Sequence, residues 1–320
     1  MRVTSGTVRP ARTVLVTGGA GFIGRSLCAA LVARGDHVHL VDLLPGARQR
    51  CAVTALPAVE VTAADLATAA LRELLLGVDV VVHLAARPGV QPSWGSGFEH
   101  YLRDNAIVTQ RLLEAVGERR VVIASSSSVY GEVAHGAVTE DAPLRPLSPY
   151  GVSKVAAEML VHTYVALGVD AVVLRYFSVY GRHQRPDMAV ARIVDAAATG
   201  TPFSLRGDGS QCRDLTHVDD VVAATIAALD ARIASGTVIN VGSGRPVELR
   251  TVIAEVSRQT GVAVPVTNVP ETAGDPARTA ADRRRAAELL GWAPVIDLAD
   301  GIADQIEAAA VFGHEAETVA

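Results

Sequence analysis

The sequence predicts an α/β protein with a Rossmann-type, doubly wound parallel sheet and a smaller α/β substrate-binding domain. Runs of strand length alternate with helical segments through the first half of the 320 residues, and a glycine-rich turn follows the first run. Hydrophobic residues make up 49% of the chain but aromatic residues only 4%, and alanine and valine dominate. This composition suits a parallel sheet that is covered by helices on both faces.

The expected elements follow from hydrophobic runs and from helix start and stop signals. Ser148 and Pro149 mark the N-cap and the first position of a helix, and Gly35 marks the end of another. Asp65 is a plausible N-cap for a third. Strands are expected at 13–16, 37–42, 59–61, 79–84, 120–124 and 170–175, and helices at 22–34, 66–76, 98–116 and 150–167.

The alternation loosens after residue 176, where short strands and glycine-rich turns follow. Segments 218–231 and 238–241 are expected to return to the main sheet. The resulting division gives a dinucleotide-binding domain at 12–176 plus 218–243, a substrate-binding domain at 177–217 and 244–312, and flexible tails at 1–11 and 313–320.

Composition argues against several classes of protein. The net charge is −5 and no long basic run occurs, so a nucleic-acid partner is not expected. No apolar segment is long enough to span a bilayer, and the N-terminus lacks a signal-peptide pattern. Cys28, Cys51 and Cys212 show no metal-binding or paired spacing, which favours reduced thiols in a cytoplasmic protein without a metal site.

The glycine-rich turn predicts a dinucleotide site. Gly18 permits a tight turn, Gly21 lets the backbone approach a pyrophosphate, and Gly24 lets helix and strand pack closely. Phe22 and Ile23 begin the helix, whose N-terminal N–H groups and dipole favour phosphate. A glycine-rich turn without a ligand is the alternative, but its place between a strand and a helix favours binding.

Asp42 ends the second expected strand, where an acid accepts hydrogen bonds from ribose hydroxyls. A carboxylate there repels a 2′-phosphate and favours NAD over NADP, although Arg48 and Arg50 lie nearby in the sequence. Asp65 and Leu66 are candidates to contact adenine, and a purely capping role for Asp65 carries equal weight.

Tyr150 and Lys154 stand four residues apart on one face of a helix, and the serine run 125–128 lies upstream at the end of a strand. A free tyrosine has a pKa of about 10, and a neighbouring ammonium group lowers it enough for general-base catalysis. The alternative for the pair is a surface tyrosine with a solvated lysine, and for the serines a strand-ending turn. In combination with the glycine turn, the pattern predicts a nicotinamide-dependent enzyme that acts at a carbinol carbon.

Between residues 13 and 302 the chain resembles the extended short-chain dehydrogenase/reductases, in their NAD-dependent nucleotide-sugar epimerase/dehydratase branch. The motifs are VTGGAGFIG (16–24), VVHLAA (81–86), SSSSVYG (125–131), SPYGVSK (148–154), LRYFSVYG (174–181), RPDMA (185–189), GDGSQCRDLTHVDD (207–220) and INVGSG (239–244).

The resemblance implies roles for individual positions. Ser126 matches the catalytic serine or threonine, Tyr150 the base, and Lys154 the lysine that binds the nicotinamide ribose. Arg213 matches an arginine that binds the substrate diphosphate, a surface ion pair with Asp214 or Asp219 being the alternative. The further positions expected to contact the cofactor are Leu84, Ala85, Ala86, Asn105, Ala124 and Tyr176.

Three serines narrow the reaction that the resemblance implies. The similar 4,6-dehydratases carry Asp-Glu where this chain has Ser127 and Ser128, and Ser178 stands where asparagine is frequent. With the arginine at 185 and Met188, these residues look most like the substrate site of UDP-glucuronate 4-epimerases. Gln91 departs from an arginine that is frequent in such enzymes, and Arg87 or His183 are candidates to compensate.

The resulting expectation is a 4-epimerase that converts UDP-glucuronate to UDP-galacturonate through a transient 4-keto sugar, with tightly bound NAD. The alternatives are a UDP-glucose or UDP-N-acetylglucosamine 4-epimerase, a UDP-glucuronate decarboxylase, a reductase of 4-keto-deoxysugars, and a non-catalytic NAD-sensing module. Similar enzymes commonly dimerise through the helices around Asn105 and Tyr150, so a homodimer is expected.

Overall fold

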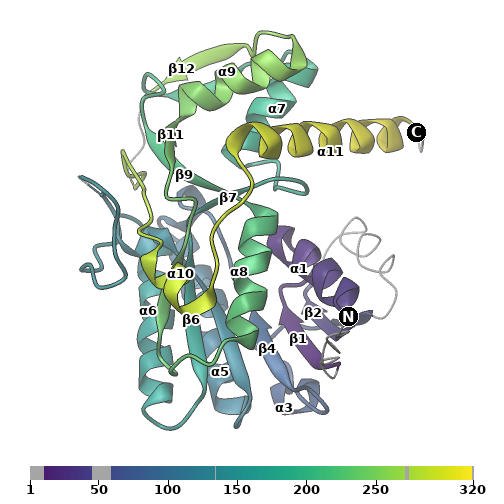
Figure 1. Cartoon of the computed structure of the whole chain (residues 1–320), viewed down its shortest axis with the longest axis vertical. Coiled ribbons are helices and arrows are strands. Elements are labelled where there is room, and N and C mark those ends of the chain that lie inside the picture. The colour runs from purple at the N-terminus through teal and green to yellow at the C-terminus, as the bar shows by residue number, and fades with distance from the viewer. Residues whose placement is uncertain (1–10, 45–58, 134, 271–273, 319–320) are drawn as a thin grey trace, which may run out of the picture.

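A seven-stranded parallel sheet forms the centre of the molecule in the computed structural model, which describes residues 11–44, 59–133, 135–270 and 274–318 (Figure 1). The strand order is β10-β6-β5-β4-β1-β2-β3, in which the chain reverses direction of winding next to β1. The strands are β1 Thr13–Thr17, β2 His37–Asp42, β3 Val59–Ala63, β4 Val80–His83, β5 Arg120–Ser126, β6 Ala171–Tyr176 and β10 Val238–Val241.

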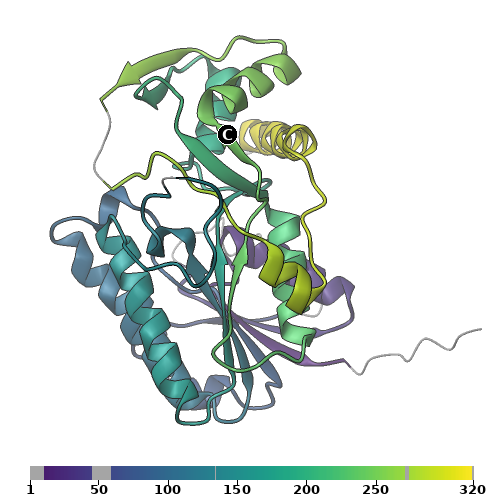
Figure 2. The same ribbon diagram turned by 60° about the vertical axis from the view of Figure 1, so that its left-hand side comes forward.

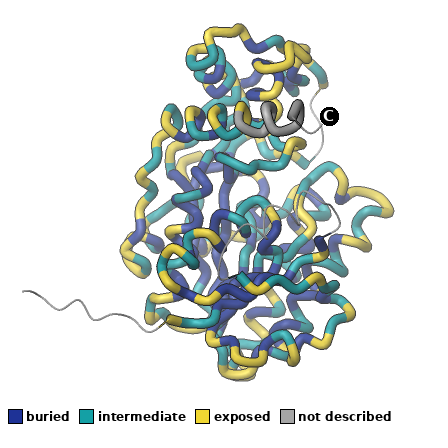
Figure 3. The backbone as a smooth tube through the Cα atoms, turned by 90° about the vertical axis from the view of Figure 1, so that its right-hand side faces the viewer, coloured by how far each residue is buried: buried dark blue, intermediate teal, exposed yellow. Residues whose placement is uncertain are grey.

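Helices cover both faces of this sheet, as the alternating pattern predicts (Figure 2). The central strands are nearly continuous hydrophobic runs because both of their faces are buried, and every residue of β6 is buried. Figure 3 shows buried residues in the interior and exposed residues along the outer loops and helices. One face packs against α1 Phe22–Ala33, α8 Val218–Asp230 and α10 Arg284–Leu290, and the other against α3 Leu71–Leu74, α5 Val108–Ala115 and α6 Pro149–Val165.

Helix α6 begins as its sequence predicts. The Ser148 hydroxyl accepts a hydrogen bond from the Gly151 N–H (3.2 Å), and Pro149 occupies the first turn. The serine hydroxyl satisfies one N–H group at the helix start, and proline has no N–H group to satisfy. This places Tyr150 at the first turn of α6, at the carboxyl edge of the sheet.

Two expected helices differ from the structure. The helix expected at 66–76 is only α3, because the Arg111 side chain binds the carbonyl oxygens of Leu66 (3.1 Å) and Ala69 (2.9 Å) instead. The helix expected at 98–116 contains a π-helical stretch, a feature that periodicity does not reveal. Its parts are α4 Gly97–Tyr101, η2 Leu102–Ile107 and α5, and the preceding short turn is η1 Gln91–Ser93.

A smaller α/β unit lies above the carboxyl ends of the main strands (Figure 1). Its core is separate from the two layers around the main sheet and includes Ile193, Phe203, Val252 and Ile302. It contains the sheets β11-β9-β7 and β12-β8. The elements are β7 Ser178–Tyr180, α7 Ala189–Thr199, β8 Phe203–Arg206, β9 Cys212–His217, β11 Pro246–Glu248, α9 Leu249–Thr260, β12 Val266–Val269 and α11 Leu298–Thr318.

The C-terminal part differs from the expected division in two respects. Helix α10 lies within 244–312 but packs on α8 and β10, where Ala286 and Trp292 join the core of the main sheet. Helix α11 continues to Thr318 through most of the tail expected at 313–320, because alanine and glutamate favour helix there despite Gly313. Within the described ranges, no helix combines the length and apolar character needed to cross a membrane.

Candidate active site

A cleft of about 870 Å³ lies between the carboxyl edge of the main sheet and the smaller unit. Open α/β sheets bind ligands at this edge, where the winding reverses. The cleft is lined by every residue that the sequence assigns to the cofactor or the substrate, with the single exception of Asn105. The geometry of the cleft therefore follows from the backbone conformation and the hydrogen bonds of each segment that lines it.

The turn between β1 and α1 has no room for side chains. Gly18 has φ +70°, and a Cβ atom there would lie 2.6 Å from the Ala85 N atom; a Cβ at Gly24 would collide with the Gly18 carbonyl. Gly21 precedes α1 with no side-chain cap, so the first N–H groups of the helix face the cleft. A backbone cradle at a helix N-terminus fits the pyrophosphate of NAD.

The carboxylate of Asp42 borders the adenosine side of this cradle. Its Oδ2 accepts from the Ala20 N–H (3.0 Å) and its Oδ1 from the Leu43 N–H (2.7 Å), so β2 and the glycine turn are tied together. The negative charge fits ribose hydroxyls and disfavours a 2′-phosphate. Arg48 and Arg50, which qualified this expectation, lie outside the described residues.

Asp65 closes a short turn and also lines the cleft. Its Oδ1 accepts from the Ala67 N–H (2.9 Å), its carboxylate pairs with Arg103, and Leu66 follows it on the cleft wall. The hydrogen bond from Ala67 is the main reason that the pKa of Asp65 is lowered, with help from Arg103. The helix-capping role expected for Asp65 is wrong, because the helix that follows begins only at Leu71 and has Ala70 as its N-cap. The contact with adenine stays a prediction.

The predicted catalytic residues converge at the ends of β5 and α6. Ser126 ends β5, and its hydroxyl accepts from the Ser128 N–H (3.1 Å). The Tyr150 N–H donates to the Ser93 hydroxyl (3.1 Å), and the Tyr150 ring meets Tyr101 edge to face at 6.0 Å. Lys154 is buried, and its Nζ donates to the Ala124 carbonyl (2.9 Å).

Burial raises the pKa of Tyr150, while a hydrogen bond with Ser126 and the positive charge of Arg185 oppose that rise. Burial also lowers the pKa of Lys154 to about 8. The sequence predicts that Lys154 lowers the pKa of Tyr150, but in this structure the cation that lowers the pKa of Tyr150 is Arg185. A bound nicotinamide cation would add to the same effect.

Hydroxyl groups and one arginine lie on the substrate side of Tyr150. Ser127, Ser128 and Ser178 line the cleft together with Arg185 and Met188. The Arg185 guanidinium also pairs with Asp187, its Nε donating to Oδ1 at 2.9 Å. This part of the cleft can bind an anionic or strongly hydroxylated group.

Arg213 contributes a cation at the far end of the cleft. Its NH1 group donates to the Cys212 carbonyl (2.9 Å), and burial lowers its pKa. Asp214 instead accepts from Ser243 and from neighbouring N–H groups, and Asp219 pairs with Arg182. The alternative of an ion pair between Arg213 and Asp214 or Asp219 is therefore wrong.

Asn105 does not line the cleft. Its side chain accepts from the Arg87 N–H (2.6 Å) and donates to the Arg87 carbonyl (3.1 Å) and the Ser153 hydroxyl (2.9 Å). Asn105, in the π-helical stretch η2, thus joins this loop to α6, and the cofactor contact expected for it stays a prediction. Arg87 pairs with Asp104 (2.8 Å), and neither Arg87 nor His183 lines the cleft to compensate for Gln91.

Sequence reasoning missed a group of residues at the outer end of the cleft. The Arg192 guanidinium lies 5.2 Å from the centre of the Phe203 ring, and Arg206 pairs with Asp275 at 2.6 Å. No motif marks these positions, since they come from separate segments that meet only in the folded chain. The missed lining residues at this end are Arg192, Phe203, Ser204, Arg206, Gln211, Leu249 and Asp275.

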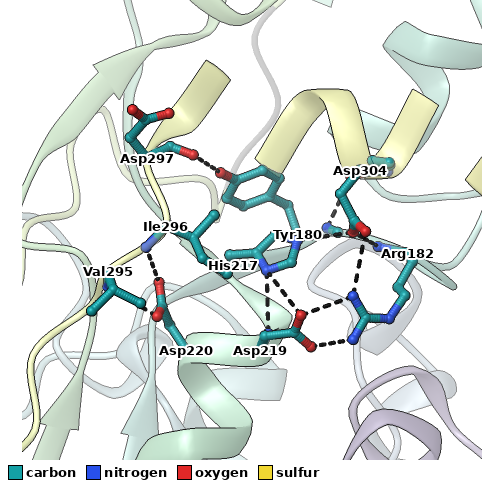
Figure 4. A network of polar contacts seen from close by, with 11 residues as sticks. Tyr180, Arg182, His217, Asp219, Asp220, Val295, Ile296, Asp297 and Asp304 are labelled. Carbon is teal, nitrogen blue, oxygen red and sulfur yellow. Dashed lines mark hydrogen bonds and ion pairs between the residues drawn. The ribbon is translucent and has the colours of Figure 1, made fainter. Parts of the chain in front are cut away.

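A polar network holds the loop that leads from β7 to Arg185. Figure 4 shows Arg182 between Asp219 of α8 and Asp304 of α11, with His217 beside them. The Gly181 N–H donates to Gln305 of α11 at 2.9 Å, and His217 Nε2 lies 3.1 Å from Asp304. The substrate side of the cleft thus depends on helix α11, far away in the sequence.

Comparison with known proteins agrees with this geometry. A model of the NAD dependent epimerase/dehydratase family matches residues 14–242. A Bacillus subtilis (strain 168) protein described as an uncharacterized UDP-glucose epimerase, YtcB, is 39% identical over 305 residues, which are 92% of this chain and 96% of that protein.

Two solved structures with bound ligands are also similar. The UDP-glucuronic acid 4-epimerase from Bacillus cereus, in complex with UDP-glucuronic acid and NAD, has a TM-score of 0.89 and 37% identity, covering 94% of this chain and 99% of that one. MoeE5, in complex with UDP-glucuronic acid and NAD, has a TM-score of 0.88 and 41% identity with the same coverage.

Proposed function

Because the chain belongs to the NAD dependent epimerase/dehydratase family, we propose that it is a 4-epimerase that interconverts UDP-glucuronate and UDP-galacturonate. NAD is the cofactor of this enzyme, and the cradle formed by Gly18, Gly21 and Gly24 fits its pyrophosphate.

The residues at the ends of β5 and α6 can move the proton that epimerisation requires. Tyr150 takes the proton of the sugar 4-hydroxyl, and Ser126 hydrogen-bonds the same oxygen. NAD, when bound, supplies the hydride acceptor and donor together with a positive charge at its nicotinamide. After the keto sugar has turned about its diphosphate, held by Arg213, it would present its other face to the nicotinamide. Return of the hydride to that face would invert C4, while Tyr150 returns the proton to the C4 oxygen.

The observation that carries the choice of sugar is the grouping of Ser127, Ser128 and Ser178 with Arg185 beside Tyr150. A 4-ketone is β to the C5 carboxylate of a uronic acid, and β-keto acids readily lose carbon dioxide. Loss requires the breaking bond to align with the carbonyl π system. Several hydrogen bonds to the carboxylate can hold it out of that alignment while the ketone persists.

The same grouping argues against water elimination. That reaction needs an acid and a base near C5 and C6, and the positions that follow Ser126 are Ser127 and Ser128. Serine hydroxyls do not exchange protons in this way near neutral pH. A 4,6-dehydratase is therefore disfavoured.

A neutral sugar such as UDP-glucose is the second candidate, and one contact favours it. Arg185 is already neutralised by Asp187, and Gln91 brings no charge to the cleft wall, so a carboxylate would find less positive charge there. The Bacillus subtilis relative is described as a UDP-glucose epimerase. The two candidates differ only in the group at C5.

The deciding experiment is proton NMR of the purified protein with UDP-glucuronate and no added cofactor. Appearance of UDP-galacturonate supports the proposal. Formation of UDP-xylose or a 4-keto pentose would show that the serine grouping does not protect the keto acid. No change, with conversion of UDP-glucose in a parallel sample, would establish the neutral sugar.

We also propose that the enzyme is a cytoplasmic homodimer. The exposed apolar residues Ile107, Val152 and Met159 lie on the adjacent helices η2 and α6, and between 43% and 50% of the surface of each residue is accessible. Cys28 and Cys212 are free thiols, which suits a reducing compartment. Light scattering of the wild type and of Met159→Glu tests the dimer, because a charge at its centre would yield monomers.

A further inference from the structure

A buried ion pair lies beneath the catalytic residues, and the proposed chemistry uses neither of its members. Glu158 of α6 is fully buried, and Arg175 of β6 is 4% exposed. The Arg175 Nε donates to Glu158 Oε1 (3.0 Å) and its NH2 group to Oε2 (2.6 Å). Desolvation offsets most of the attraction in such a pair, so stability alone is a weak reason for it.

The pair is linked to the catalytic strand through Ser125. The Ser125 hydroxyl donates to Glu158 Oε1 at 2.5 Å, and the preceding carbonyl, of Ala124, accepts from Lys154 Nζ at 2.9 Å. Two successive residues of β5 are thus tied to two residues of α6 that lie one turn apart. The next residue of β5 is Ser126, and the preceding turn of α6 carries Tyr150.

The same carboxylate acts on the charge of Lys154. Burial lowers the pKa of Lys154 to about 8, and the negative charge of Glu158 opposes this fall. The other titratable neighbours from packed elements are His83 of β4, whose pKa is lowered to about 3 so that it is neutral, and Arg175, which lies beyond Glu158. Tyr130 joins the network through Arg175 at 2.7 Å.

We propose that Glu158 is a positioning residue which, with Ser125 and Arg175, sets α6 against β5 so that Tyr150 meets Ser126, and which keeps the Lys154 cation in its buried place. Lys154 is then held by two contacts of different kinds: a hydrogen bond to Ala124 and the field of a carboxylate one turn away. The role in turnover rests on the proposed function, whereas the effect on Lys154 does not.

The chain offers an unusually clean test, because Lys154 is its only lysine among 320 residues. Protein labelled with ¹³Cε-lysine should give one side-chain NMR signal, whose pH titration reports Lys154 directly and needs no sugar substrate. We expect Glu158→Gln to lower the midpoint by about one pH unit from the wild-type value. The matched control is Asp36→Asn, which removes a buried carboxylate paired with Arg34 at the opposite edge of the sheet.

An unchanged midpoint in folded Glu158→Gln protein would overturn the electrostatic part of the proposal. If that variant does not fold, the double variant Glu158→Met with Arg175→Met removes both charges at similar volume and is titrated in its place. A shift of the same size in Asp36→Asn would also contradict the proposal, because it would reveal a general effect of destabilisation.

Ser125→Ala tests whether Glu158 positions α6 against β5, because it removes the hydrogen bond from Ser125 to Glu158 but leaves the ion pair between Glu158 and Arg175 intact. We expect kcat to fall about tenfold while KM and the amount of bound NAD stay unchanged, because only the approach of Tyr150 to Ser126 is altered. An unchanged kcat in Ser125→Ala would show that Ser125 does not contribute to positioning α6 against β5. If no nucleotide sugar is turned over by the wild type, the proposed function fails, while the lysine titration still decides the role of Glu158.

Discussion

The two halves of the cleft are built in different ways. The cofactor half is mainly local in sequence: β1, the glycine turn and α1 form one continuous segment, closed by Asp42 at the end of the next strand. The substrate half gathers Ser178, Arg185 and Arg213 from separate segments and relies on α11 to hold the loop between them. The cofactor half can be predicted from sequence motifs because its residues are neighbours in the chain. The substrate half cannot, because tertiary contacts bring its residues together.

The halves meet at Tyr150, and its hydroxyl belongs to neither. We expect Tyr150→Phe to lower kcat by about 10³-fold or more while NAD remains bound, because only the proton transfer is lost. Turnover assays together with cofactor extraction from the purified variant check this. Substantial remaining activity would mean that another group is the base.

Gly18→Ala should break the cofactor half alone. The added methyl would lie 2.6 Å from the Ala85 N atom, so we expect loss of most bound NAD and about a hundredfold loss of activity. The control is Gly35→Ala, which has the same sign of φ (+88°) but no atom within 4 Å of the new methyl. Equal loss of NAD in both variants would attribute the effect to backbone strain and not to the cradle.

Arg213→Met should affect only the substrate half. Loss of a charged hydrogen bond to the diphosphate should raise KM about 30-fold, with bound NAD unchanged. Arg250→Met provides the comparison, because this exposed arginine of the same unit pairs with Glu248 and does not line the cleft. Steady-state kinetics with both variants would refute the assignment if their KM values were alike.

Asp304→Asn should have the smallest effect. The pair with Arg182 is partly exposed, so its loss should loosen the loop before Arg185 and raise KM only about threefold. The control is Glu307→Gln, which removes the same charge from an exposed position on α11. A change in NAD content in Asp304→Asn would show that the two halves are not independent.

The sequence predicts most of the cleft wall around the glycine turn, because glycine turns and strand ends have local physical causes. Gly18, Gly24 and Asp42 occupy the places that their motif predicts. Two expected helices differ from the structure: Arg111, distant in the sequence, binds carbonyl groups where the helix after Asp65 was expected, and a π-helical stretch interrupts the helix expected at 98–116. On the substrate side, Phe203 and Arg206 carry no motif, since only the packing of β8 beside the cleft gives them a role.

All basic side chains of the lysine and arginine types are arginine except Lys154, and this has a consequence for chemical labelling. A guanidinium stays charged at any physiological pH, whereas an ammonium group can lose its proton once it is buried. Of the 29 basic residues, 28 are therefore fixed charges and one is titratable. Lys154 is the one lysine side chain that an acylating reagent or enzyme can modify, so acylation at that position measures how open the cleft is around it.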